Sequence, residues 1–351
     1  MDTCPRNHGL HCILPPYVVD HMAKSADPAV RRLAMDTMQA GAAARAMRSV
    51  LATMPAMAAI PSVAGKKERR VYDLQNDGMW ALPGKLIREE GEGNVGDPAV
   101  NEAYRYAGNV YDFYKKVFAR NSLDDLGMAL ISSVHFGKKH NNAYWNGEQM
   151  IYGDGDGQRF VRFTKALDVV AHEFSHGVVT HTCNLVYANE SGALNEHFAD
   201  VMGVLCRQWQ NDENAKTADW TVGKDCLGPD VNAVSLRTFL DAKAFEDDPF
   251  LGTDQQPKHA SGMYTGSDDY GGVHINSGIP NHAFYLTAIE LGGKAWTRAG
   301  LIWYDTMSML TKTSDFAEMV DKTLQAATSR YGAGSVEAKA VKAGWKGVGL
   351  S

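Results

Sequence analysis

The sequence has no apolar run long enough to span a lipid bilayer, and neither sign of charge dominates it. Its 35 lysines and arginines are outnumbered by 41 aspartates and glutamates, and the net charge of −6 argues against a nucleic-acid-binding surface. The five cysteines have no spacing typical of a disulfide framework, so reduced thiols are expected. With 44% hydrophobic residues, the 351-residue chain is expected to be globular and long enough for two domains.

The N-terminus also lacks the pattern of a secretory signal. The apolar segment from Ile13 to Val19 is short and is interrupted by Pro15 and Pro16. No small-residue cleavage pattern comes directly after it. We therefore expect synthesis in the cytoplasm, and any secretion would use a route other than a cleaved signal peptide.

A zinc-binding motif is present in the middle of the chain. His172, Glu173 and His176 form the pattern His-Glu-x-x-His. Positions four apart share one face of an α-helix, so the two histidines could bind one Zn²⁺ through their imidazoles. Glu173 would lie beside the metal, where a general base for a zinc-bound water belongs. The motif also occurs by chance, and a third, anionic ligand is needed to support the prediction.

Residues 189–200 supply a candidate for that ligand. Ser191 is expected to cap a helix, because apolar residues come after it at helical spacing. Glu196 and Asp200 lie four apart and would share a face of this helix. We therefore expect one Zn²⁺ held by Glu196 and the two histidines, with Asp200 accepting the second N–H of a ligating histidine.

The N-terminal region differs in character from the rest of the chain. Cys4, His8, His11 and Cys12 could form a second zinc site. Their intervals do not fit paired ligands, and a solvated tail is the better interpretation. A helix is expected from Asp27 to about Ser49.

The pattern His172-Glu173-x-x-His176, followed after nineteen intervening residues by Glu196 in Asn-Glu-x-x-x-Asp, resembles the thermolysin family of zinc metalloendopeptidases. The resemblance runs from about Asn101 to the C-terminus. It implies an α+β fold of two lobes with the zinc helix between them. The implied parts are a partly helical propeptide (1–60), a β-rich lobe ending in the zinc helix (61–180) and an α-helical lobe (181–351).

The resemblance also implies the catalytic roles. Glu173 would take a proton from the zinc-activated water and deliver it to the leaving amine. Tyr187 and His274 would stabilise the oxyanion, and Asp269 would fix the tautomer of His274. The glycines in Asp269-Tyr-Gly-Gly-Val-His274 permit a tight turn that presents His274 to a cleft.

Substrate contacts are implied in the same way. Asn142 would contribute its side-chain amide, Ala143 and Trp145 main-chain groups, and Arg237 a contact to a carbonyl on the leaving-group side. A plain edge strand is the alternative for residues 142–145. An apolar pocket would favour a hydrophobic residue on the leaving-group side. Its implied lining is Phe160, Phe163, Val169, Val222, Cys226 and Leu236.

One subgroup of the family, of which protealysin is the example, has a short propeptide with a Pro-Pro-aromatic motif. Pro15, Pro16 and Tyr17 match this motif. The resemblance implies that the propeptide blocks the cleft, since a Pro-Pro element does not easily adopt the extended pose of a cleavable substrate. Processing is expected between Met47 and Gly65, which has weak structural signals.

Calcium sites of thermolysin are matched only in part. Asp168, Asp219 and Asp225 match ligand positions, whereas Arg207 and Lys224 place positive charge where two carboxylates would be required. We therefore expect no structural Ca²⁺.

Two rival functions remain beside the favoured one. A binding protein could use the scaffold without turnover, keeping residues 1–60 as a permanent domain. A toxin-like protease could act on one physiological target. The favoured interpretation is a monomeric zinc endopeptidase made as a latent precursor. Its partners would be protein or peptide substrates and its own propeptide, without nucleic acid.

Overall fold

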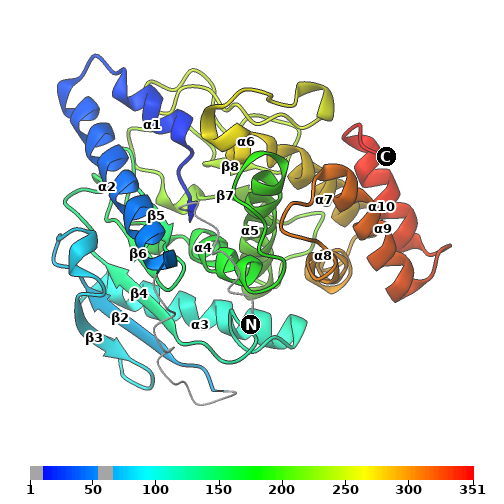
Figure 1. Cartoon of the computed structure of the whole chain (residues 1–351), viewed down its shortest axis with the longest axis horizontal. Coiled ribbons are helices and arrows are strands. Elements are labelled where there is room, and N and C mark those ends of the chain that lie inside the picture. Colours follow the sequence, from blue (N-terminus) through cyan, green and yellow to red (C-terminus); the bar gives the residue numbers. More distant parts are fainter. Residues whose placement is uncertain (1–10, 54–65) are drawn as a thin grey trace.

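The computed structural model describes residues 11–53 and 66–351, without the side chains of residues 11 and 44–53. A mixed sheet lies on one side of the molecule and helices α7–α10 lie on the other, with α4 and α5 between them (Figure 1). The predicted two-lobed α+β arrangement is therefore confirmed. The region that links α2 to β2, residues 54–65, contains most of the expected processing segment and lies outside the described residues.

Six strands form the sheet of the β-rich lobe, in the order β1-β5-β6-β4-β2-β3. Parallel pairing joins β2 to β4 and β4 to β6, and the other neighbours are antiparallel. Strand β1 comes from the N-terminal region and occupies the edge next to β5. The strands are β1 (His11–Cys12), β2 (Arg69–Asp73), β3 (Lys85–Glu89), β4 (Leu130–Val134), β5 (Ala143–Trp145) and β6 (Met150–Tyr152).

Helix α3 (Pro98–Phe118) packs against the sheet and the central helices. It starts at Pro98 because the Asp97 carboxylate accepts hydrogen bonds from two free backbone N–H groups of the first turn. Its apolar residues recur at helical spacing and are buried. The helix ends before Ala119, which adopts a left-handed conformation with φ 57°.

The central pair, α4 (Leu167–Thr180) and α5 (Asn189–Gln210), is the most extensively packed pair of elements. A Cβ atom at Gly203 would lie 2.6 Å from the carbonyl oxygen of Asp168, so only glycine allows this approach. The predicted cap at Ser191 is wrong. Helix α5 starts at Asn189, and the Ser191 hydroxyl instead donates to backbone carbonyl groups before and at the start of the helix.

The α-helical lobe contains α6 (Asp268–Asn276), α7 (Gly278–Leu291), α8 (Ala299–Met307), α9 (Phe316–Tyr331) and α10 (Val336–Gly347). A short two-stranded sheet, β7 (Thr221–Val222) and β8 (Arg237–Thr238), lies beside them. Non-helical Arg298 (φ −125°, ψ −66°) separates a 3-10 turn from the start of α8. Among the described residues, no helix has the length and apolarity needed to cross a bilayer.

The N-terminal region forms β1, α1 (Pro16–Ala23) and α2 (Pro28–Thr53). The prediction of a helix from Asp27 to about Ser49 is confirmed, and the helix extends four residues further. Helix α1 buries Val18, Val19 and Met22. These side chains join the main hydrophobic core, so the N-terminal region is packed against the rest of the chain.

His135 links three parts of the β-rich lobe. Its Nε2 lies 2.7 Å from the Asp97 carboxylate, and its Nδ1 lies 2.8 Å from that of Asp154. The hydrogen bond to Asp154, supported by that to Asp97, outweighs burial and raises the pKa of His135 to about 9. The charged imidazole thereby connects the start of α3 to the loop after β6.

We expect this linkage to make stability depend on pH. The pKa in the folded state lies above the ordinary value of 6.5, so the ion pairs stabilise the fold fully below pH 6.5. Their contribution falls as the pH rises and is lost above about 9. His135→Gln should therefore lower the free energy of unfolding by about 2 kcal/mol at pH 6 and much less at pH 9.5. Urea titrations of both proteins at several pH values would measure this difference, and a pH-independent difference would contradict the prediction.

Candidate functional site

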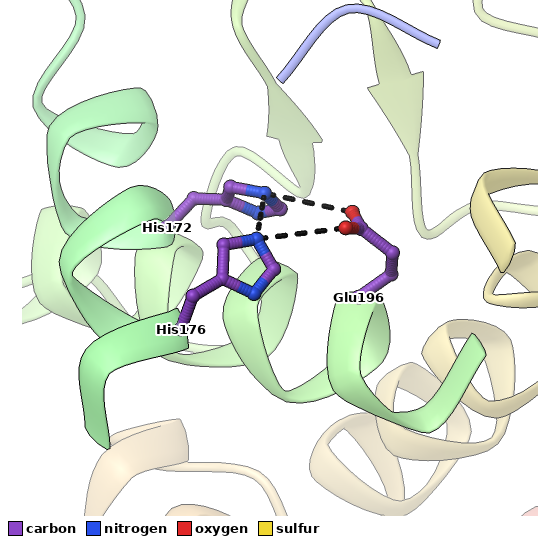
Figure 2. A group of neighbouring side chains, drawn as sticks. All are labelled: His172, His176 and Glu196. Atoms are coloured by element: carbon purple, nitrogen blue, oxygen red, sulfur yellow. Dashed lines mark hydrogen bonds and ion pairs between the residues drawn. The ribbon is translucent and has the colours of Figure 1, made fainter. Parts of the chain in front are cut away.

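The predicted metal ligands come together where α4 packs on α5 (Figure 2). The Nε2 atoms of His172 and His176 lie 3.1 Å apart. Each of these nitrogens lies 3.5 Å from one carboxylate oxygen of Glu196. All three side chains are fully buried. Three potential ligand atoms therefore face a common point.

The outer nitrogens of the two imidazoles show that this point suits a cation. Nδ1 of His172 lies 2.8 Å from Asp200, and Nδ1–H of His176 donates to Asn195 Oδ1 at 2.8 Å. With both Nδ1 protons directed outward, the two Nε2 lone pairs face each other and an anionic carboxylate. The facing lone pairs and the carboxylate repel one another unless a cation lies between them. Two imidazoles with one carboxylate are a donor set that binds zinc. The motif and its spacing did not point to Asn195, although it immediately precedes Glu196.

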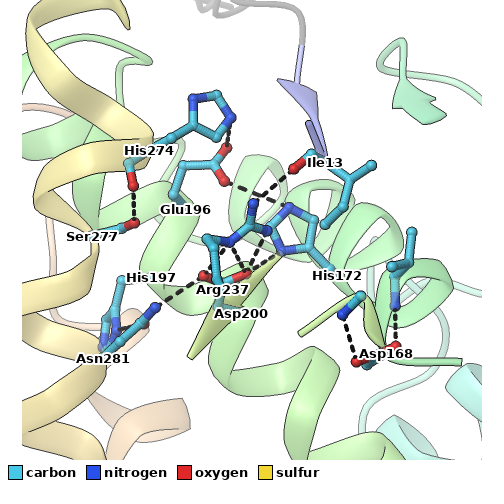
Figure 3. A network of polar contacts seen from close by, with 12 residues as sticks. Ile13, Asp168, His172, Glu196, His197, Asp200, Arg237, His274, Ser277 and Asn281 are labelled. Atoms are coloured by element: carbon cyan, nitrogen blue, oxygen red, sulfur yellow. Dashed lines mark hydrogen bonds and ion pairs between the residues drawn. The ribbon is translucent and has the colours of Figure 1, made fainter. Parts of the chain in front are cut away.

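A buried polar network supports Asp200 from behind (Figure 3). Two guanidinium nitrogens of Arg237 donate to its carboxylate, at 2.9 and 2.8 Å. Asn281 donates to the same carboxylate at 2.9 Å, and is itself held by His197. Burial opposes ionisation, but Arg237 and His172 hold the pKa of Asp200 well below its usual range. Asp200 therefore presents a fixed negative charge to His172.

Glu173 lies next to the ligands without belonging to them. Its carboxylate is fully buried, and its oxygens make no side-chain hydrogen bond within the described part of the chain. Burial, with smaller contributions from Cys12 and the Glu196 carboxylate, raises the pKa of Glu173 well above its usual range. A carboxylate with a raised pKa is suited to exchange protons near neutral pH.

The predicted oxyanion-stabilising groups lie on the other side of Glu196. Nδ1–H of His274 donates to Asp269 at 2.6 Å, while its Nε2 lies 3.6 Å from Glu196. The Tyr187 hydroxyl donates to Glu196 and lies 3.2 Å from Nε2 of His274. Although burial opposes it, the carboxylates of Glu196 and Asp269 raise the pKa of His274. His274 is positioned by a break in α6, where residues 269–272 have positive φ.

The N-terminal segment passes directly through this site. Cys12 pairs with Tyr144 in β5, and the Cys12 carbonyl accepts a hydrogen bond from Nε2 of His274 at 3.0 Å. The Ile13 carbonyl accepts from Arg237 at 2.7 Å (Figure 3). The segment before the Pro-Pro motif therefore occupies the site, paired as a strand up to Cys12 and hydrogen-bonded through residues 13 and 14, which form a bend.

The Pro-Pro motif comes directly after this segment. Pro15 is extended and precedes α1, and Pro16 is in the first turn of that helix. Tyr17 is largely buried, and burial together with Asp254 raises its pKa well above the usual value. The motif therefore ends the extended segment and anchors it.

The remaining predicted substrate contacts lie around this segment. Asn142 Oδ1 accepts from the backbone N–H of Leu14 at 3.2 Å, and Ala143 and Trp145 belong to the strand that pairs with β1. The residues predicted to line the apolar pocket are all buried in the hydrophobic cluster that contains Ile13. They are Phe160, Phe163, Val169, Val222, Cys226 and Leu236.

Arg207 occupies a position at which the family resemblance implies a calcium ligand. Its Nη1 donates to the buried Asp168 carboxylate, 2.5 Å away, and also to the carbonyl of Thr221. Lys224, in contrast, is largely exposed, and its Nζ lies 3.9 Å from Asp219. Of the two cationic residues, Arg207 is therefore the one that neutralises a buried carboxylate.

Comparisons with known proteins agree with this geometry. The profile described as "Thermolysin metallopeptidase, catalytic domain" matches residues 63–180, and "Thermolysin metallopeptidase, alpha-helical domain" matches residues 183–350. An extracellular metalloprotease of Pectobacterium carotovorum subsp. carotovorum is 45% identical over 289 residues, 82% of each chain. Protease PrtS of Photorhabdus is 40% identical over 351 residues, which cover 98% of this chain and 93% of that one. The structure of the precursor of protealysin, a metalloproteinase from Serratia proteamaculans, has a TM-score of 0.87 and 40% identity. The match covers 97% of this chain and 100% of the protealysin precursor chain.

The pair formed by Arg207 and Asp168 should contribute to stability. Arg207→Leu leaves a buried carboxylate without its cation, and we expect the free energy of unfolding to fall by about 2–4 kcal/mol. Lys224→Leu is the matched control, because the Lys224 side chain is 59% exposed. It should change stability by less than about 1 kcal/mol. Denaturant titration would measure both, and equal effects would contradict the assigned role of Arg207.

Proposed function

The chain belongs to the thermolysin family of metallopeptidases, and as a metalloendopeptidase of this family we propose that it uses zinc, prefers a hydrophobic residue on the leaving-group side and is made as a latent precursor. The observation that carries this proposal is the buried convergence of His172, His176 and Glu196. The chain also has a complete set of candidate catalytic groups around that point. This set favours an enzyme over a binding protein that uses the scaffold without turnover.

The proposed catalytic roles derive from the geometry of the chain's own residues. His172, His176 and Glu196 would hold Zn²⁺, which when bound polarises a carbonyl group and acidifies water. Glu173 accepts the proton of the attacking water and passes it to the leaving amine. His274 and Tyr187 donate hydrogen bonds to the developing oxyanion, with Asp269 holding the imidazole in place.

Substrate binding would use the groups that now hold the N-terminal segment. An extended peptide can add to the edge of β5, with main-chain groups of Ala143 and Trp145 as its partners. Asn142 and Arg237 then bind the backbone on the leaving-group side. The apolar cluster next to these residues supports the preference for a hydrophobic side chain at that position.

Latency would result from the occupied site. Residues 1–60 form the inhibitory propeptide in this proposal, 61–180 the β-rich catalytic lobe and 181–351 the helical lobe. Pro15, Pro16 and Tyr17 anchor the blocking segment, and processing occurs between Met47 and Gly65. The relative from Pectobacterium is described as extracellular, which supports secretion of this chain. We also propose that the enzyme is monomeric.

The role of Glu173 can be separated from that of the metal ligands. Glu173→Gln keeps the size of the side chain but removes the base, so cleavage of casein should fall by about 10²–10⁴-fold or more. The purified variant should still contain zinc by elemental analysis, whereas His176→Ala should have lost it. Addition of 1,10-phenanthroline to the processed wild-type enzyme should stop cleavage. Full activity of Glu173→Gln would refute the assigned role.

The proposed absence of structural Ca²⁺ can be tested by thermal unfolding. The guanidinium of Arg207 neutralises Asp168 in place of a divalent cation, so a calcium-selective chelator should leave the melting temperature unchanged. Added Ca²⁺ should have no stabilising effect either. A large loss of stability on chelation, reversed by Ca²⁺ but not by Mg²⁺, would overturn this part of the proposal.

A further inference from the structure

We propose that the N-terminal segment is bound in the register of a substrate, with the peptide bond between Cys12 and Ile13 at the point of hydrolysis, and that the chain cleaves itself there. This inference rests on the proposed function of the site. It differs from simple blockage because it identifies one bond in the blocking segment that the site is arranged to cut.

The Cys12 carbonyl is the main-chain group that marks the register. Its oxygen accepts a hydrogen bond from Nε2 of His274 at 3.0 Å. The same nitrogen lies 3.2 Å from the Tyr187 hydroxyl and 3.6 Å from the Glu196 carboxylate. The carbonyl is thus held by His274, whose Nε2 is itself next to Tyr187 and to a predicted metal ligand. The bond next to this carbonyl group, on its C-terminal side, is Cys12–Ile13.

Backbone contacts hold the residues on either side of the bond, with strand β1 ending at Cys12 and a bend at residues 13 and 14. On the side before it, Cys12 pairs antiparallel with Tyr144 of β5. On the side after it, the carbonyl of Ile13 accepts from Arg237 at 2.7 Å, and the N–H of Leu14 donates to Asn142 at 3.2 Å. Backbone contacts on both sides fix the orientation of the bond between them.

The side chain of Ile13 adds a second constraint. It is completely buried in the main apolar cluster, and the chain continues through Pro15 into α1, whose Val18 and Met22 are also buried. Leu14 is buried in the same cluster, so packing holds residues 13 and 14 in the site. The hydrogen bonds to His274, Arg237 and Asn142 set the register.

The reaction is ordinary hydrolysis. A water oxygen forms a bond to the carbonyl carbon of Cys12, and the bond from that carbon to the nitrogen of Ile13 breaks. Glu173 carries one water proton to the leaving nitrogen, and the second water proton follows to the same nitrogen. The products are a carboxylate at Cys12 and an ammonium group at Ile13. The part that begins at Ile13 keeps its contacts through α1, whereas residues 1–12 become a separate peptide.

The test uses the full-length chain, incubated with one equivalent of Zn²⁺ at neutral pH and monitored by intact-mass spectrometry and N-terminal sequencing. We expect a product that begins at Ile13 and a peptide of residues 1–12, with a rate independent of protein concentration. Glu173→Gln should yield neither. Ile13→Asp should slow this cleavage by about tenfold or more, because it would bury a charge, while Ile13→Val should retain it.

A second measurement tests the register without turnover. In the Glu173→Gln protein, hydrogen exchange should show slow exchange at the Leu14 amide. Ile13→Asp in that background should remove the protection, and Ile13→Val should keep it. Exchange at Leu14 as fast as in an unstructured peptide would overturn the register, as would cleavage at Cys12–Ile13 in the Glu173→Gln protein.

A casein assay on the same preparations distinguishes the two proposals. If casein is cleaved while the Cys12–Ile13 bond stays intact throughout, self-cleavage is wrong and the proposed function stands. If neither casein nor this bond is cleaved although zinc is bound, both proposals fail.

Discussion

Two imidazole nitrogens and a carboxylate face one another in a buried space, and the surrounding structure keeps them there. Without a cation between them, His172, His176 and Glu196 would gain more by separating. They stay together because α4 and α5 approach closely at Gly203, and because their outer atoms are held by Asp200 and by other polar groups. The metal site is therefore a consequence of helix packing before it is a feature of any single motif.

The same packing requires charge neutralisation throughout the interior. Asp200 is buried, but Arg237 and Asn281 satisfy its oxygens, so it remains ionised beside His172. One turn earlier in α4, Arg207 neutralises the buried Asp168. Both of these buried carboxylates have a cation directed at them. Loss of either cation would leave an unpaired carboxylate in a low-dielectric environment. Such networks fix side-chain positions as well as charge, which a site for hydrolysis requires.

Arg237 has a further role that joins stability to binding. It contacts Asp200 with one part of its guanidinium and the Ile13 carbonyl with another. The N-terminal segment thereby uses the same polar framework that orients the metal ligands. Its own strand pairing and the buried face of α1 add to the contact. The blocking segment is consequently part of the folded core. Its removal would open the site and would expose the Arg237 N–H group that now donates to the Ile13 carbonyl.

Local patterns in the sequence were sufficient to locate the zinc motif, the four-residue spacing of Glu196 and Asp200, and the helix after Asp27, because these depend on periodicity and capping. They did not reveal the start of α5 before Ser191 or the role of Asn195, which depends on a tertiary contact to His176. The family resemblance, rather than a local pattern, pointed to Pro15, Pro16 and Tyr17 as the inhibitory motif.

The placement of residues 11–14 across the site was decided by tertiary packing alone. It depends on pairing with β5 and on contacts to Arg237 and His274, residues more than two hundred positions away along the chain. Local sequence patterns carry no information on such long-range contacts, because these contacts form only when the two lobes pack together.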